Sequence, residues 1–213
     1  MALYDRVVFD ASILDLRPEL APLLQREWQR LERPGSFWTA VERVALAAEA
    51  RHERYGDAVE PHDLRAEAVE AARLLGANPA AARREWVERM AGALGYPAYV
   101  ELVGVVARLA AVDSLHVALG LARPTLPVPV AGEPGGTLDP KARAGAAWVP
   151  MFGGASIAHA LSLVPAEDEA QEDMHRLYLT YEEMSDITFA RGLTRSQMEL
   201  VAGRTSAVNE CFY

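Results

Sequence analysis

Apolar side chains recur every three or four residues through most of the first 120 residues, which is the spacing of amphipathic helices. One helix is predicted from Pro18 onward and is ended by Pro34-Gly35, and a second opens at Ser36 or Thr39 and is ended by Gly56. Three more are predicted over 61–75, 79–94 and 97–120. The last of these is apolar nearly all round, so we expect it to be the buried centre of the fold.

The pattern breaks between residues 122 and 154, which hold six prolines and six glycines. No helix tolerates that density, so this segment is predicted to be an extended linker or a wrapping arm. Helical signals resume over 155–164 and 165–187, and again from Thr194. The chain is therefore predicted to be all-α.

The last predicted helix carries the most distinctive residues. Thr194-x-x-Gln197 and Ser196-x-x-Glu199 both have the form of a capping box, which marks a helix start. The helix should end near Asn209, and Cys211, the only cysteine, lies just beyond that point. A weak internal repeat at an offset of 157 residues superposes Glu42 on Glu199, so residues 39–52 correspond to this helix.

The composition limits the class of protein, its partners and its cellular compartment. The chain of 213 residues is 51% apolar and 24% charged, as in ordinary globular proteins. Its net charge of −9 argues against a nucleic-acid partner or an anionic membrane. A single cysteine cannot form an internal disulfide, and the N-terminus lacks a signal-peptide core. We therefore expect a cytoplasmic protein.

The C-terminal spacing resembles a known pattern. Residues Ser196, Glu199, Ala202, Ser206, Asn209, Cys211 and Tyr213 match the core motif of the alkylhydroperoxidase (AhpD-like) branch of the carboxymuconolactone decarboxylase superfamily. That motif is a glutamate, eleven residues, a cysteine, two residues, a second cysteine, three residues and a histidine. Glu199 and Cys211 match its first two members, whereas the second cysteine and the histidine would fall at positions 214 and 218.

The resemblance implies an all-α, AhpD-like helical bundle of two copies. A degenerate first copy would occupy 1–121, the Pro/Gly-rich segment 122–154, and the beginning of a second copy 155–213. It implies reduction of a hydroperoxide in antioxidant defence, with Cys211 as resolving thiol and Glu199 as proton acceptor. The expected partners are the hydroperoxide, a thiol or dithiol reductant and further copies of the chain, with no cofactor and no metal.

The two matched residues cannot act together along one helix. Twelve residues of straight helix would separate Cys211 from Glu199 by roughly 18 Å and place them on different faces. A turn at Asn209 would let a returning helix bring a residue near position 218 level with Glu199. Since this sequence stops at 213, we expect little or no peroxidase activity from it. Either a domain or cloning boundary falls after residue 213, or codon 214 is UGA and is read as selenocysteine in the source organism.

Three alternatives stay open. Glu49-x-x-His52 and Glu172-x-x-His175 have the spacing found in di-metal carboxylate bundles, although they occupy unrelated places in the two copies. A non-catalytic helical assembly domain would also fit a first copy without a thiol. Carboxymuconolactone decarboxylation fits less well, because that branch does not need the cysteine pair.

Asp113 and His116 are predicted to be a hydrogen-bonded core pair.

Overall fold

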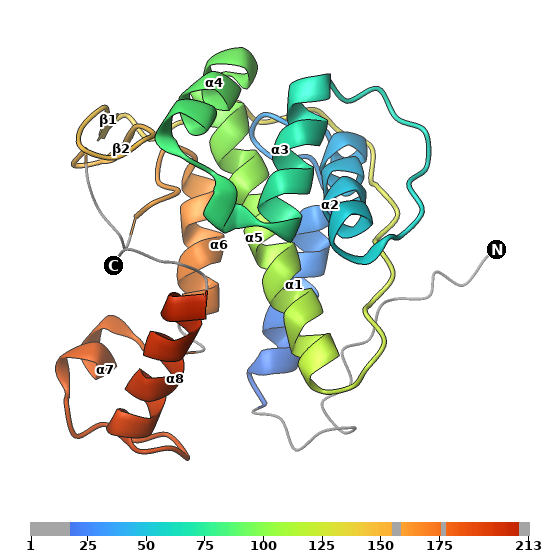
Figure 1. Ribbon diagram of the computed structural model, residues 1–213. Coiled ribbons are helices and arrows are strands. Elements are labelled where there is room, and N and C mark those ends of the chain that lie inside the picture. Colours follow the sequence, from blue (N-terminus) through green and yellow to red (C-terminus); the bar gives the residue numbers. More distant parts are fainter. Residues whose placement is uncertain (1–17, 155–158, 176–177, 209–213) are drawn as a thin grey trace.

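The computed structural model describes residues 18–154, 159–175 and 178–208, and this part of the chain is almost wholly helical (Figure 1). The helices are α1 (Leu20–Leu31), α2 (Ala40–Tyr55), α3 (Ala66–Ala77), the 3₁₀ turn η1 (Pro79–Ala81), α4 (Arg84–Leu94), α5 (Tyr96–Ala118), α6 (Pro165–His175), α7 (Tyr181–Ser185) and α8 (Arg195–Val208). Two strands of two residues each, β1 (Ala142–Arg143) and β2 (Met151–Phe152), form a small antiparallel pair. The prediction of an all-α chain is confirmed.

Helix α5 is the centre of the structure, as its sequence predicts. It contacts α1, α2, α3, α4 and α6, and Figure 1 shows it running through the middle of the array. Leu102 and Val112 on this helix are completely buried. Because α5 is surrounded on most sides, it needs apolar residues around most of its circumference, which explains its weak amphipathicity.

The ends of α2 follow from local chemistry. The Thr39 hydroxyl accepts a hydrogen bond from the Glu42 N–H, and the Glu42 carboxylate accepts one from the Thr39 N–H. This capping box satisfies two backbone donors that the first helical turn leaves free. Gly56 ends the helix with φ of 76°, a left-handed conformation that glycine adopts without a steric penalty.

Helices α2 and α3 form a closely packed antiparallel pair. Their shared interface consists of small buried residues, namely Ala47, Ala50, Ala68, Ala71, Ala72 and Gly76. A Cβ atom added at Gly76 would lie 2.8 Å from the Ala50 Cα and carbonyl oxygen. The two backbones are therefore too close for any side chain at this position.

Four predicted helices differ from the observed ones. Helix α3 begins at Ala66 rather than Pro61, because the preceding segment is held extended while His62 bonds to Glu49 of α2. The segment 79–94 divides into η1 and α4, with extended backbone at Ala82 and Arg83 between them.

The other two differences lie after residue 154. Residues 159–164 form turns instead of the predicted helix, and residues 155–158 lie outside the described residues. The long helix predicted over 165–187 is also wrong. Helix α6 ends at His175, and Thr180 caps the separate short helix α7 through a second capping box with Glu183.

The proline-rich segment after α5 lies along the helical array as a wrapping arm. The Val130 N–H donates to the Glu32 carbonyl at 2.7 Å, and the Gly136 N–H donates to the Ser36 carbonyl at 2.7 Å. The Trp28 indole N–H in turn donates to the Thr125 carbonyl at 2.9 Å. These bonds satisfy backbone N–H and C=O groups of the segment, which has no regular secondary structure here to pair them. The division of the chain at residues 121 and 154 stays a prediction.

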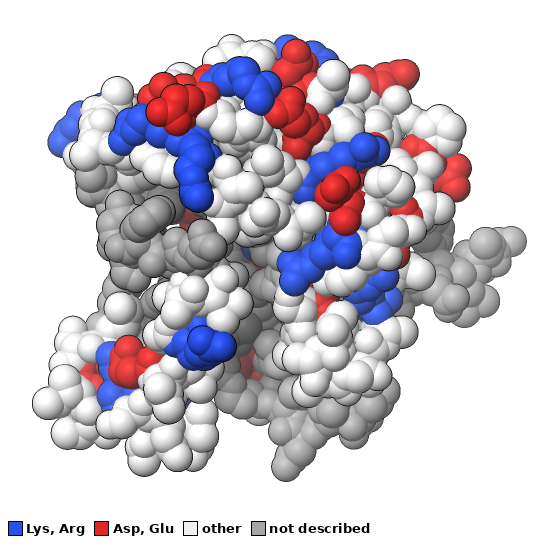
Figure 2. Space-filling model, viewed as in Figure 1, with Lys and Arg blue, Asp and Glu red and all other residues white. Residues whose placement is uncertain are grey.

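Helices α7 and α8 lie together beside the end of α6, away from α2, α3 and α4 (Figure 1). Figure 2 shows that basic and acidic side chains are interspersed over the main array, while most of the visible α7–α8 surface is uncharged. Within the described ranges, no helix combines the length and apolar character that a membrane crossing requires.

The close approach of α2 and α3 gives a direct test. Gly76→Ala should destabilise the protein by about 1–3 kcal/mol, because the new methyl group meets the Ala50 backbone. Gly92 on α4 has open space around its Cα, so Gly92→Ala should stabilise by up to about 1 kcal/mol through helix propensity. Urea unfolding of both variants measures the difference. Equal effects of the two substitutions would contradict the packing described.

Candidate functional site

Helix α8 carries Glu199, one of the two site residues predicted from the sequence, the other being Cys211. Cys211 lies outside the described residues. Glu199 is the fifth residue of α8 and is exposed, and its carboxylate accepts a hydrogen bond from the Arg195 Nε at 2.7 Å. The i,i+4 spacing places both side chains on one face of the helix. The Arg195 guanidinium group therefore faces the Glu199 carboxylate.

The start of α8 is only partly as predicted. Thr194 and Gln197 form a reciprocal capping box, with the Thr194 N–H donating to the Gln197 side chain at 2.9 Å. Because Thr194 caps the helix, Ser196 lies inside it, and the predicted Ser196–Glu199 box does not form. Glu42 is thus the third residue of α2 whereas Glu199 is the fifth of α8, so the internal repeat does not extend to the helix caps.

Tyr178 is a neighbour of Glu199 that the sequence did not indicate. Burial raises the pKa of the Tyr178 hydroxyl, the negative charge of Glu199 raises it further, and Arg195 opposes both. The hydroxyl oxygen is buried and has no hydrogen-bond partner within the described chain. A neutral, proton-bearing group therefore lies near the carboxylate. No sequence spacing links Tyr178 to α8, because the approach depends on the turn after α6.

A second cluster of functional groups lies in the core, between α1, α2, α5 and α6. Glu101 of α5 is fully buried and accepts hydrogen bonds from the Arg43 Nη1 at 2.8 Å and from the Phe37 N–H at 2.6 Å. Arg43 also reaches Glu167 of α6 at 3.4 Å. Arg108 pairs with Glu167 and, at 2.8 Å, with Glu27 of α1. We call these five residues the ionic core.

The ionic core is not electrically balanced by its own members, since it holds three carboxylates and two guanidinium groups. Burial raises the pKa of Glu101 and Glu27 above the ordinary carboxyl value, despite the attraction of Arg43 and Arg108 respectively, and the nearby Glu167 adds to the rise. A raised carboxyl pKa favours the folded state below the ordinary pKa, and that contribution is lost as the pH rises through the folded-state value. Arg30, which pairs with Glu27 and Asp173, supplies a third positive charge at the edge.

A surface cavity of about 400 Å³ opens beside the ionic core. Its wall includes four arginines, namely Arg26, Arg30, Arg33 and Arg43, and two glutamates, Glu167 and Glu169. The buried Nε of Arg43 has no hydrogen-bond partner among the described residues. Arg30 and Arg43 are nevertheless already paired with carboxylates, so half of the positive charge of this wall is used within the protein.

The two predicted Glu-x-x-His pairs do not form. Glu49 bonds instead to His62 at 2.8 Å and to Arg73 at 2.6 Å, while the His52 ring bonds to the Asp57 carbonyl oxygen. Burial raises the pKa of Glu49, but the bonds from Arg73 and His62 outweigh burial and leave the pKa below its ordinary value. Nothing in this arrangement brings the Glu49 and Glu172 helices to a shared metal site.

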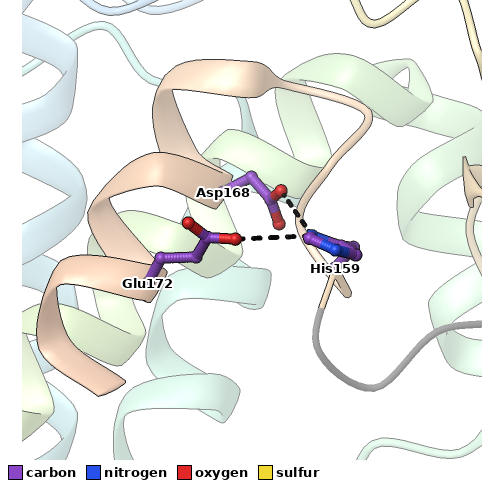
Figure 3. A group of neighbouring side chains, drawn as sticks. All are labelled: His159, Asp168 and Glu172. Atoms are coloured by element: carbon purple, nitrogen blue, oxygen red, sulfur yellow. Dashed lines mark hydrogen bonds and ion pairs between the residues drawn. The ribbon is translucent and has the colours of Figure 1, made fainter. Parts of the chain in front are cut away.

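Glu172 meets a different histidine. His159, in the turn before α6, places its Nδ1 3.0 Å from Asp168 Oδ2 and 3.7 Å from Glu172 Oε1 (Figure 3). Asp168 and Glu172 are one turn apart on α6, so their carboxylates lie on the same side of the helix. His159 has no partner in the sequence pattern, and only the turn at 159–164 brings it to α6. We call His159, Asp168 and Glu172 the α6 triad.

Asp113 and His116 are not the predicted core pair. Asp113 is held by Arg51 of α2 through two hydrogen bonds of 2.9 and 2.6 Å. The His116 Nδ1 lies 2.7 Å from the Val112 carbonyl oxygen of its own helix. The Arg51–Asp113 pair joins α2 to α5, whereas the His116 contact lies within α5.

Comparisons of the chain with protein families, with curated proteins and with solved structures find no match. The function must therefore be inferred from the residues and their geometry.

The ionic core predicts a large difference between two neighbouring glutamates of α6. Glu167→Ala should cost about 1–3 kcal/mol, because it leaves buried donors of Arg43 and Arg108 without the carboxylate that they share. Glu169→Ala, at an exposed position two residues further along, should change stability by less than about 0.5 kcal/mol. Urea unfolding at neutral pH measures both. A Glu167 variant as stable as the Glu169 variant would show that the ionic core does not hold α6.

Proposed function

We propose that the activity associated with this chain is thiol-dependent reduction of a hydroperoxide, of the AhpD-like kind, to which this sequence contributes Glu199 and Cys211. The observation that carries the proposal is the extent of α8. The described residues Arg195–Val208 form one continuous helix, as the part of the motif that precedes Asn209 requires. Glu199 therefore lies near its start, and Cys211 follows three residues after its last residue.

Glu199 suits the role of proton acceptor. Its carboxylate is exposed and accepts a hydrogen bond from the Arg195 side chain. The Tyr178 hydroxyl, which has no hydrogen-bond partner among the described residues, offers a neutral donor close enough to feel the charge of Glu199. An exposed carboxylate can take a proton from a thiol or an intervening imidazole without first breaking a buried ion pair.

Cys211 fits the resolving role, in a reaction that needs a second thiol. In the proposed cycle that second thiolate attacks the outer oxygen of the hydroperoxide, the O–O bond breaks, and an alcohol leaves. The attacking sulfur becomes a sulfenic acid. The Cys211 sulfur then displaces its hydroxyl group as water and forms a disulfide. A dithiol reductant restores both thiols by exchange.

The surface of α8 supports a contact with another copy of the chain. Leu200, Val201 and Val208 are exposed by 73%, 58% and 64% respectively, and they lie within about 100° of one another around the helix. In α2, the positions equivalent to Leu200 and Val208 are occupied by the buried residues Arg43 and Arg51. The proposed homo-oligomer would cover this stripe in a comparable way.

The catalytic proposal is tested by completing the motif. A chain extended to carry a cysteine at position 214 and a histidine at position 218 should reduce an organic hydroperoxide with a dithiol as electron donor, and the sequence as printed should not. Cys211→Ser in the extended chain should abolish turnover. Glu199→Gln should lower the rate by about 100-fold, the usual effect of losing a general base.

The matched control is Glu42→Gln, at the equivalent position of α2, where glutamine can still cap the helix. Its rate should equal that of the extended parent chain. No turnover by the extended chain, or turnover indifferent to Cys211, would refute the proposed function.

The oligomer proposal predicts that the chain sediments as a dimer or larger assembly at micromolar concentration. Leu200→Glu should shift it to the monomer, because a charge in the apolar stripe cannot be desolvated without a partner. Val128→Glu, at a valine of the wrapping arm that is 63% exposed, should leave the sedimentation unchanged. A monomeric parent chain would show that α8 is not an interface between copies.

A further inference from the structure

The α6 triad brings together the three commonest kinds of protein ligand for a first-row divalent metal ion. One ligand atom from each of His159, Asp168 and Glu172 can be chosen so that all three lie within 4.8 Å of one another. Figure 3 shows the imidazole facing the two carboxylates, with all three side chains converging on the space between the turn and the helix. Each residue is half-buried, so the space is bounded by protein yet open to solvent.

The charge environment of the α6 triad differs from that of the buried carboxylates elsewhere. Every fully buried carboxylate in the described chain pairs with an arginine, and these carboxylates are Glu27, Glu49, Glu101, Asp113 and Glu167. Asp168 and Glu172 have no such partner among the described residues, and their ion pairs are with His159. Two carboxylates that share one imidazole leave negative charge uncompensated whenever that imidazole is neutral.

Asp168 has an unused acceptor in this space. Its Oδ1 atom is buried and has no hydrogen-bond partner within the described residues, although a carboxylate oxygen normally accepts at least one hydrogen bond when buried. Burial raises the pKa of Asp168 despite the bond from His159, and the charges of Glu172 and Asp139 raise it further. A cation would relieve both the unfilled acceptor and the repulsion between the carboxylates.

His159 of the α6 triad is contacted by Ser162 and Phe152. The Ser162 hydroxyl donates to the His159 carbonyl oxygen at 2.7 Å and accepts from the Phe152 N–H at 2.7 Å. The Phe152 ring meets the imidazole edge-on, with ring centroids 5.7 Å apart. These contacts hold the His159 backbone and pack one edge of its ring.

We propose that the α6 triad binds a divalent first-row metal ion such as Zn²⁺, through the His159 Nδ1 and one oxygen each of Asp168 and Glu172. A set of one nitrogen and two oxygens suits zinc, and three protein ligands leave a position for water. This site shares no residue with the proposed thiol chemistry, so either proposal can fail without the other.

The test is isothermal titration of the full chain with Zn²⁺ at pH 7.5. The parent chain should bind one ion, and His159→Ala and Asp168→Asn should each lower the affinity at least 10-fold. Glu169→Gln, on the exposed side of α6, and His62→Ala, at a histidine that bonds to Glu49 away from α6, are matched controls and should bind as the parent does. Equal binding by all five proteins, or no saturable binding by the parent, would overturn the proposal.

Thermal unfolding provides a second measurement that guards against variants that simply fold poorly. Zn²⁺ should raise the Tm of the parent chain and of both controls, since a ligand that binds only the folded state stabilises it. It should leave the Tm of His159→Ala unchanged whatever the starting value. Glu172→Gln, which keeps the size of the side chain, replaces Asp168→Asn if the latter is unfolded. A zinc-dependent rise in Tm that survives His159→Ala would place the ion elsewhere and refute the site.

Discussion

The ionic core is the interaction on which the arrangement of this protein depends. It joins α1, α2, α5 and α6, which come from sequence positions as far apart as Glu27 and Glu167. Buried charges are costly to desolvate, so each must keep its partner in good geometry, and no helix in the set can rotate or slide alone. At two positions the backbone passes so close to these carboxylates that only glycine fits. Gly104 of α5 faces Glu167 and Gly35 faces Glu101, and a Cβ atom at either glycine would collide with the carboxylate.

Sequence reasoning succeeded where interactions between residues close in the sequence decide the structure. The helices α1, α2 and α5 and the capping box at Thr39 were predictable, because periodicity and capping act within a few residues. The buried centre at α5 followed from the same periodicity. The helix start near Pro61 was mispredicted because a contact with another helix decides it, and the helix over 165–187 was mispredicted because a second capping box interrupts it. His62 bonds to Glu49, and Thr180 caps a new helix where the pattern indicated continuity.

The partners of the charged residues could not be predicted for a related reason. Glu-x-x-His spacing correctly placed Glu49 near His52 and Glu172 near His175 along their helices, but spacing says nothing about residues on other segments. Glu49 pairs with His62 and Arg73, and Glu172 pairs with His159. Glu199 is different, because its role was inferred from a motif. The structure places it on an exposed helical face beside Arg195, an environment that local spacing does determine.

Helix α6 connects the ionic core to the α6 triad. Glu167 and Asp168 are consecutive, so their side chains leave the helix about 100° apart, one toward the ionic core and the other toward the turn that carries His159. Because Glu167 is held by two arginines, the rotation of α6 about its axis is fixed, and with it the direction of Asp168 and Glu172. The carboxylates of the α6 triad are thus oriented by ion pairs on another face of the same helix. A change in the ionic core that allowed α6 to rotate would therefore separate these carboxylates from His159 without touching any of the three residues.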